Sequence, residues 1–170
     1  MHRKLLICLA AGLLAGCITT NENGETVWVE GLDTMPAKYC TTDNAPAKQA
    51  DWTKATVVEE AVTDHLYESG LITLWQNKPY VIRITNNDPG MRSFRAPEFL
   101  QDAAILKVVY KDKATETPCM TALTLAPDAT AEFHIVPLKK GSYDYHETRI
   151  FSPFWGEVIS TADVGLIYVH

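Results

Sequence analysis

Five side chains in the C-terminal half of the chain have the chemistry of metal ligands: Cys119, Met120, His134, His146 and Glu147. Thiolate and thioether sulfurs favour Cu(I), and imidazole nitrogens bind several transition metals. Glu132 shares a strand face with His134, because side chains alternate along a strand with a period of two. Neither His-x-x-x-His nor paired Cys-x-x-Cys spacing accompanies these residues. A metal site is therefore one alternative, and packed or solvated side chains are the other.

The N-terminus has the features of a lipid-attachment signal. Two basic residues precede an apolar run over residues 5–14, which is too short to span a bilayer. The run ends at Leu14-Ala15-Gly16-Cys17, and this pattern resembles the lipobox of bacterial lipoproteins. The resemblance implies that residues 1–16 form a signal peptide, cleaved off, and that the Cys17 thiol is then acylated, for example with palmitate. Several acyl chains anchor a protein stably, whereas one chain binds only reversibly.

The same resemblance implies a location in the bacterial cell envelope, facing the periplasm. Residue 18 is Ile rather than Asp, which by resemblance to enterobacterial sorting implies the outer membrane. The whole chain has a formal net charge of −6, and the predicted cleavage removes two basic residues. A nucleic-acid partner is excluded by this charge, because phosphate binding needs a basic face. Membrane attachment would rest on the lipid.

Two cysteines remain outside the signal and the lipidation site, namely Cys40 and Cys119. Leftover cysteines usually pair in an oxidising envelope compartment, so we predict a disulfide between them. A bridge that closes a loop of about 80 residues contributes roughly 4–5 kcal/mol in the chain-entropy model. The alternative is a soft metal site, since Met120 directly follows Cys119.

The usual enzyme motifs do not occur in the sequence. It has no Gly-x-Ser-x-Gly elbow, phosphate loop, dinucleotide fingerprint or zinc-protease motif. Cys40 or Cys119 could pair with His134 or His146 as nucleophile and base, but an oxidising setting favours the disulfide. We therefore predict that the protein is not an enzyme.

Three parts of the chain differ in pattern: the signal at 1–16, a lipidated tether at 17–54 without sustained periodicity, and a strand-rich domain at 55–170. Turn residues recur about every ten positions in this domain, which favours an antiparallel β-sandwich. One short helix is predicted near 96–104, where Pro97 and Glu98 suit a first turn. Strands are expected at residues 57–66, 71–75, 80–85, 105–110, 122–125, 131–138, 143–146, 157–160 and 166–170.

Five segments, in order along the chain, resemble the cupredoxin family: Tyr80–Asp88, Ser93–Phe99, Leu125–Phe133, Gly141–Tyr145 and Phe154–Val158. In the family, the first two segments are the strand before the first copper histidine and the segment after that histidine. The third is the penultimate strand, the fourth is the strand before the copper cysteine, and the fifth is the strand after the ligand loop. The resemblance covers about two thirds of the chain. It implies an all-β, Greek-key β-sandwich.

The resemblance ends at the copper ligands. A type 1 copper site needs two imidazoles, a thiolate and a weak axial ligand. This chain has Arg92 at the position of the family's first histidine. It has Glu147, beside His146, at the position of the family's cysteine, and Phe154 at the position of the axial ligand. Since no cysteine follows Cys119, a shifted alignment cannot restore the thiolate. The departures imply that no blue copper site forms and that no cofactor is required.

Two interpretations of the converted site remain open. Arg92 and Glu147 could form a bidentate ion pair that closes the former ligand end. Alternatively, Arg92 could bind an external anion or peptide carboxylate with Arg149 nearby. Phe94, Phe151, Phe154 and Trp155 would make the surroundings apolar, which is typical of a partner surface.

The expected function is that of a membrane-anchored interaction or accessory module with an envelope protein partner. The alternative is a copper-binding protein of periplasmic copper handling or metalloenzyme maturation, with non-standard ligands.

Overall fold

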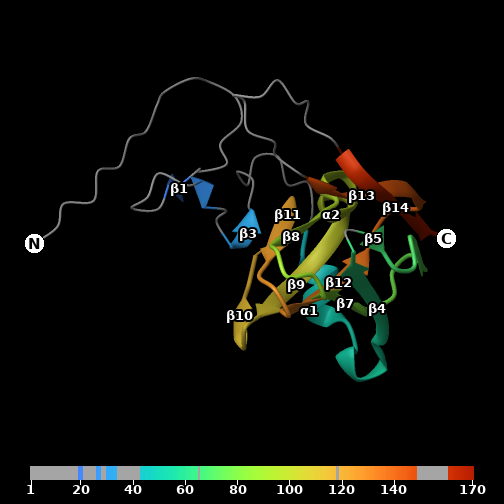
Figure 1. The fold of residues 1–170 in the computed structure, drawn as a ribbon. Helices are drawn as coiled ribbons and strands as arrows, with labels where there is room; N and C mark the ends of the chain where they lie inside the picture. Colours follow the sequence, from blue (N-terminus) through green and yellow to red (C-terminus); the bar gives the residue numbers. More distant parts are fainter. Residues whose placement is uncertain are drawn as a thin grey trace, which may run out of the picture.

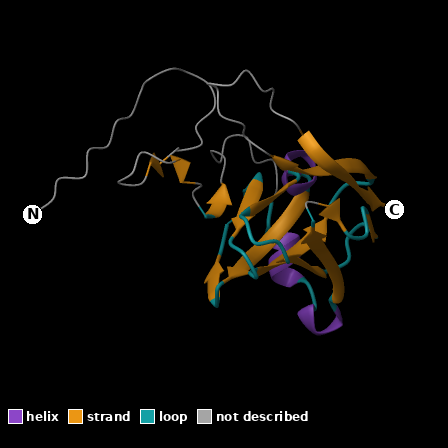
Figure 2. Ribbon diagram, in the orientation of Figure 1, coloured by secondary structure: helices purple, strands orange, loops and turns teal. Residues whose placement is uncertain are grey.

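Two six-stranded β-sheets pack against each other to form the protein, with short helices at their margins (Figures 1 and 2). The structure is a computed structural model that describes residues 19–20, 26–27, 30–33, 43–64, 66–117, 119–148 and 161–170. The predicted all-β sandwich is confirmed. The predicted signal peptide, Cys17, Cys40 and the strand at 157–160 lie outside the described residues.

One sheet, here called the β7 sheet, contains in spatial order β10 (Lys113–Thr115), β9 (Ala103–Tyr110), β12 (Thr130–Pro137), β7 (Tyr80–Asn86), β4 (Thr56–Thr63) and β5 (Leu66–Tyr67). The other, the β13 sheet, contains β3 (Gly31–Asp33), β11 (Ala122–Leu125), β8 (Arg92–Arg95), β13 (Gly141–Thr148), β14 (Thr161–Val169) and β6 (Leu71–Leu74). A separate two-stranded ladder joins β1 (Thr19–Thr20) to β2 (Thr26–Val27).

Each sheet contains one parallel pair among antiparallel neighbours. β4 runs parallel to β7, and β6 runs parallel to β14. Parallel neighbours need a crossover connection. Between β4 and β7 the chain passes through β5 and then β6, which belongs to the opposite sheet. The antiparallel arrangement predicted from the sequence therefore holds for the other pairs of the sandwich.

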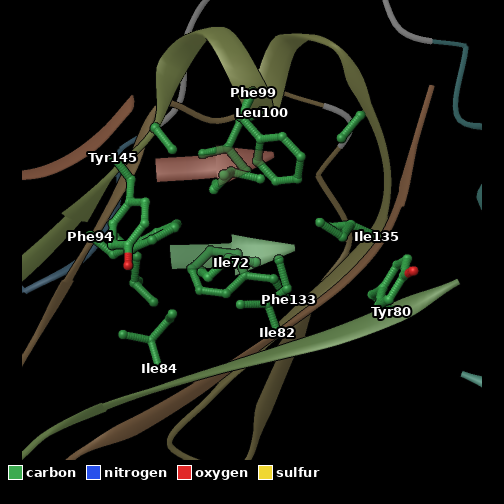
Figure 3. Close-up of a cluster of buried hydrophobic side chains, with 14 of the residues drawn as sticks. Ile72, Tyr80, Ile82, Ile84, Phe94, Phe99, Leu100, Phe133, Ile135 and Tyr145 are labelled. Carbon is green, nitrogen blue, oxygen red and sulfur yellow. The ribbon is translucent and has the colours of Figure 1, made fainter. Parts of the chain in front are cut away.

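The core lies between the sheets and is rich in aromatic rings (Figure 3). Phe94 of β8 contacts Phe133 of β12 across the interface, with ring centroids 5.5 Å apart. The helix α2 (Pro97–Gln101) adds Phe99 and Leu100, both 1% exposed. The helix predicted near 96–104 exists but is shorter, because β9 begins at Ala103. Phe94, expected at a partner surface, is instead a core residue at 1% exposure.

Two segments of the predicted tether belong to the sandwich. β3 pairs with β11 and extends the β13 sheet. The helix α1 (Ala45–Gln49) and the 3₁₀ turn Trp52–Lys54 follow, and Ala47 and Trp52 pack on the outer face of β9 and β12. For these segments the prediction of a tether over 17–54 is wrong. A five-residue helix is too short to show a 3.6-residue hydrophobic period, so the pattern carried no signal for it.

Gly165 of β14 lies directly opposite Tyr145 of β13, and the tyrosine ring covers it. A Cβ atom at position 165 would lie 2.0 Å from a Tyr145 ring carbon. Tyr145 is fully buried, so its ring has no room to move aside. The glycine is therefore required for packing between these strands.

We predict that Gly165→Ala lowers the free energy of unfolding by about 2–3 kcal/mol through overpacking, measured by urea denaturation. Gly90→Ala is the matched control, since its Cβ would meet its nearest neighbour, an Arg92 nitrogen, at an ordinary 3.7 Å. Equal stability of the two variants would contradict this account of Gly165.

Candidate functional site

Arg92, the first residue of β8, lies between two buried carboxylates. Its Nε donates to Asp88 Oδ2 at 2.6 Å, and its Nη1 lies 3.3 Å from Glu147 Oε1. The Arg92 side chain is 12% exposed, Asp88 4% and Glu147 3%. Nη1 also donates to the Met91 carbonyl. The structure thus brings Arg92 and Glu147 together, as one of the two sequence interpretations expects, and adds Asp88 at a shorter distance.

The corner between β7 and β8 positions Asp88. Asn86 is fully buried, and its side-chain oxygen accepts from the Asp88 backbone N–H at 3.0 Å. Its amide group donates to the carbonyls of Gly90 and Ala126, which ties the corner to the turn before β12. Asp88 Oδ1 in turn accepts from the backbone N–H of Asp64. These hydrogen bonds hold Asp88 in position independently of its contact with Arg92.

Sequence reasoning missed Asp88 as a partner of Arg92. The signal that could have found it is the spacing, because an aspartate four residues before an arginine in a tight corner is close enough to pair with it. Asp88, Arg92 and Glu147 are called the carboxylate–arginine cluster below. Its Arg92 donors point to groups of this chain, which favours an ion pair over an external anion.

The other residues expected at the converted site have different positions. His146 lies on the face of β13 opposite to Glu147, because the extra residue of the local β-bulge is on β14 and β13 keeps its alternation. Burial, and secondarily the positive charge of Arg95, lowers the pKa of His146. Phe154, Arg149, Phe151 and Trp155 lie outside the described residues.

The five candidate metal ligands are dispersed. Met120 is fully buried in the core between the sheets, and Cys119 beside it is 5% exposed. His134 is on the outer face of β12, where its ring lies 5.3 Å from the ring of Trp52. Within the described residues no group of three or more His, Cys, Asp or Glu side chains could hold a metal ion. The alternative that combined these residues in one site is not favoured by their placement.

Copper does not fit the residues at the end of β13. The positions expected to carry an imidazole and a thiolate hold a guanidinium and a carboxylate, which pair with each other, and the guanidinium also pairs with Asp88. A guanidinium is always protonated and offers no lone pair to a metal. The cluster therefore offers no imidazole or thiolate to a copper ion.

A third buried carboxylate links the two sheets. Glu60 of β4 is 3% exposed and accepts from the Tyr145 hydroxyl at 2.9 Å and from the Ser69 backbone N–H at 3.0 Å. The Ser69 hydroxyl also donates to it. Burial, and then the Glu60 charge, raises the pKa of Tyr145, which keeps its hydroxyl protonated as a donor. This set is structural, because these three hydrogen bonds hold the β5–β6 turn and β13 in place.

Similarity to known proteins was found only among solved structures. No protein-family model and no curated protein matches the chain. A solved structure of a reduced point mutant of amicyanin matches at 11% identity and TM-score 0.40, covering 73% of this chain and 89% of that one. Amicyanin from Paracoccus versutus matches at 14% identity and TM-score 0.40, covering 73% and 88%.

The described helices bear on whether the chain spans a membrane. Among the residues that the structure describes, no helix combines the length and the apolar character needed to cross a bilayer.

We predict strong coupling within the carboxylate–arginine cluster. Arg92→Ala leaves two buried carboxylates without their guanidinium and should cost about 3–5 kcal/mol in unfolding free energy. Asp88→Asn should cost more than Glu147→Gln, because its contact with Arg92 is shorter. In double-mutant cycles by urea denaturation, Arg92→Ala combined with either acid variant should lose clearly less than the sum. Additive losses would show that Arg92 acts independently of both acids.

We also predict an acid-sensitive contribution from His134. Burial, and secondarily the Lys107 charge, lowers its pKa below 6.5, while the nearby Glu132 opposes this shift. The unfolded chain therefore binds more protons once the pH falls below about 6.5, so stability decreases as pH is lowered through that range. His134→Gln should flatten the decrease in unfolding free energy measured between about pH 7.5 and 5.5. An unchanged slope would contradict this role of His134.

Proposed function

We propose that this protein is a lipid-anchored, non-enzymatic protein of the bacterial cell envelope whose cupredoxin-like domain acts as an interaction module. The observation that carries the proposal is the buried carboxylate–arginine cluster at the position expected for copper. Arg92 there binds Asp88 and Glu147 instead of leaving a pocket for a metal. The domain therefore keeps the sandwich without the chemistry of electron transfer.

The cluster supports an interaction role because it stiffens the end of the sandwich. Asp88, Arg92 and Glu147 come from the β7–β8 corner, the start of β8 and the end of β13. A rigid end presents the adjoining loops in one arrangement, which lowers the entropy cost of binding a partner. Pro89, exposed in the corner, lies beside the buried Asp88 and is available for contact.

The envelope location rests on the lipobox resemblance. Leu14-Ala15-Gly16-Cys17 supports cleavage before Cys17, acylation and display toward the periplasm. In that oxidising compartment we propose the disulfide between Cys40 and Cys119, which would fasten the segment after the anchor to the start of β11. The 5% exposure of Cys119 suits a shielded bridge.

The proposal is tested in cells that express the full chain with a photo-crosslinking amino acid at Pro89. We expect the protein in the outer-membrane fraction and one discrete cross-linked adduct. The same amino acid at exposed Lys113, on β10, is the matched control and should give no such adduct. Cys17→Ser should leave an unprocessed precursor or a soluble form that has lost the adduct.

Three results would count against the proposal. Processing and membrane association of Cys17→Ser like the parent would overturn the lipid anchor. Equal adducts from positions 89 and 113 would overturn the interaction surface. An intense blue absorption with one copper per chain, after Cu(II) is added to the purified protein, would overturn the assignment of Arg92 and Glu147.

A further inference from the structure

An open hollow with aromatic walls lies at the end of the β13 sheet opposite to the carboxylate–arginine cluster. It is lined by Trp75, Tyr168 and His170, together with Lys140 and Ser142 near the start of β13; these five residues are called the aromatic hollow. Ser142 and Glu147 are five residues apart on the same strand, which separates the two sites by about 16 Å. The hollow therefore belongs to another surface, beside the C-terminal end of β14.

The aromatic rings in this hollow are exposed yet fixed. Trp75 is 53% exposed and Tyr168 41%, although most large apolar side chains of the described chain are buried. The rings of Trp75 and His170 are stacked with centroids 4.7 Å apart, and Tyr168 meets His170 edge-on at 4.5 Å. Backbone bonds hold this arrangement, since Gln76 donates to the His170 carbonyl and His170 donates to that of Leu74. A ligand would meet a prearranged set of rings, which reduces the entropy cost of binding.

Positive charge accompanies the rings. Lys140 lines the hollow, and the Lys78 ammonium lies 5.4 Å from the centre of the Trp75 ring. None of the described residues that line the hollow has an acidic side chain. The chain as a whole has a net charge of −6, so this combination is a local exception. Opposite charge steers and orients a ligand, so the ligand that fits is an anion.

We propose that the aromatic hollow binds an acidic sugar, that is, a pyranose ring that carries a carboxylate, within a glycan. The C–H face of such a ring packs on an aromatic side chain while its hydroxyl groups stay in water, so a shallow, open site is sufficient. Lys140 and Lys78 pair with the carboxylate, and the Ser142 hydroxyl is placed to bond a ring hydroxyl. An acidic peptide would satisfy the lysines but would not present a flat apolar face to the rings.

The test is calorimetric titration of the full chain with tetragalacturonic acid. We expect saturable binding that weakens with added salt and exceeds the binding of neutral maltotetraose. Trp75→Ala and Tyr168→Ala should each weaken binding about tenfold or more, through loss of a ring face. Lys140→Ala should weaken binding and reduce its salt dependence. Leu71→Ala is the matched control, because Leu71 is 52% exposed on the neighbouring strand β6 and lies outside the hollow.

Circular dichroism and the melting temperature show whether each variant keeps its fold, and Trp75→Leu serves as a second variant that retains bulk without the ring face. No saturable binding of tetragalacturonic acid would overturn the proposal. Equal affinity for tetraglutamate would also overturn it, since charge alone would then explain binding. Unchanged affinity in folded Trp75→Ala and Tyr168→Ala would remove the rings from the site. None of these outcomes affects the proposed function, which rests on the opposite end of the domain.

Discussion

A buried guanidinium between two carboxylates is the constraint on which one end of this sandwich depends. Charges removed from water are tolerated only when they are paired and hydrogen-bonded. Arg92 meets that condition through Asp88 and Glu147, and the three residues come from segments that are distant in sequence. The β7–β8 corner, the start of β8 and the end of β13 must therefore fold together. Asn86 completes the arrangement by holding the corner in which Asp88 sits.

The same rule explains how the sheets are joined further inside. Glu60 is buried on β4, and Tyr145 reaches it from β13 with a protonated hydroxyl. The tyrosine ring can take this position only because Gly165 has no side chain opposite it. One polar contact and one missing Cβ atom thus fix how two strands of the β13 sheet lie against the β7 sheet. Hydrophobic packing alone would leave more freedom in that relative position, because it is not directional.

The two ends of the domain differ in chemistry. One end is closed by the carboxylate–arginine cluster, in which the charged groups are almost fully buried. The other end exposes the rings of Trp75 and Tyr168 and adds the positive charge of Lys140. Both sets lie on strands or within two residues of a strand end, which gives them a rigid base. The first end therefore contributes to stability, while the second leaves aromatic rings and positive charge in contact with solvent.

The sequence alone determined those features that depend on local pattern or on which residue types are present. Alternation over residues 80–85 predicts a strand with Tyr80, Ile82 and Ile84 on one face, and all three are buried in β7. Ala122–Leu125 forms a strand with the predicted bounds. The lack of a cysteine after Cys119 argued against a blue copper site without any geometry.

Only the tertiary structure decided the contacts between distant segments. In the folded chain Asp88 lies nearer to Arg92 than Glu147 does. The ring of Trp52 packs against that of His134. Trp75 and Tyr168 both contact His170. Strand periodicity tells which face a side chain occupies but not which strand lies beside it. Those neighbours are set by sheet order and register over long sequence separations, and no local pattern in the chain records them.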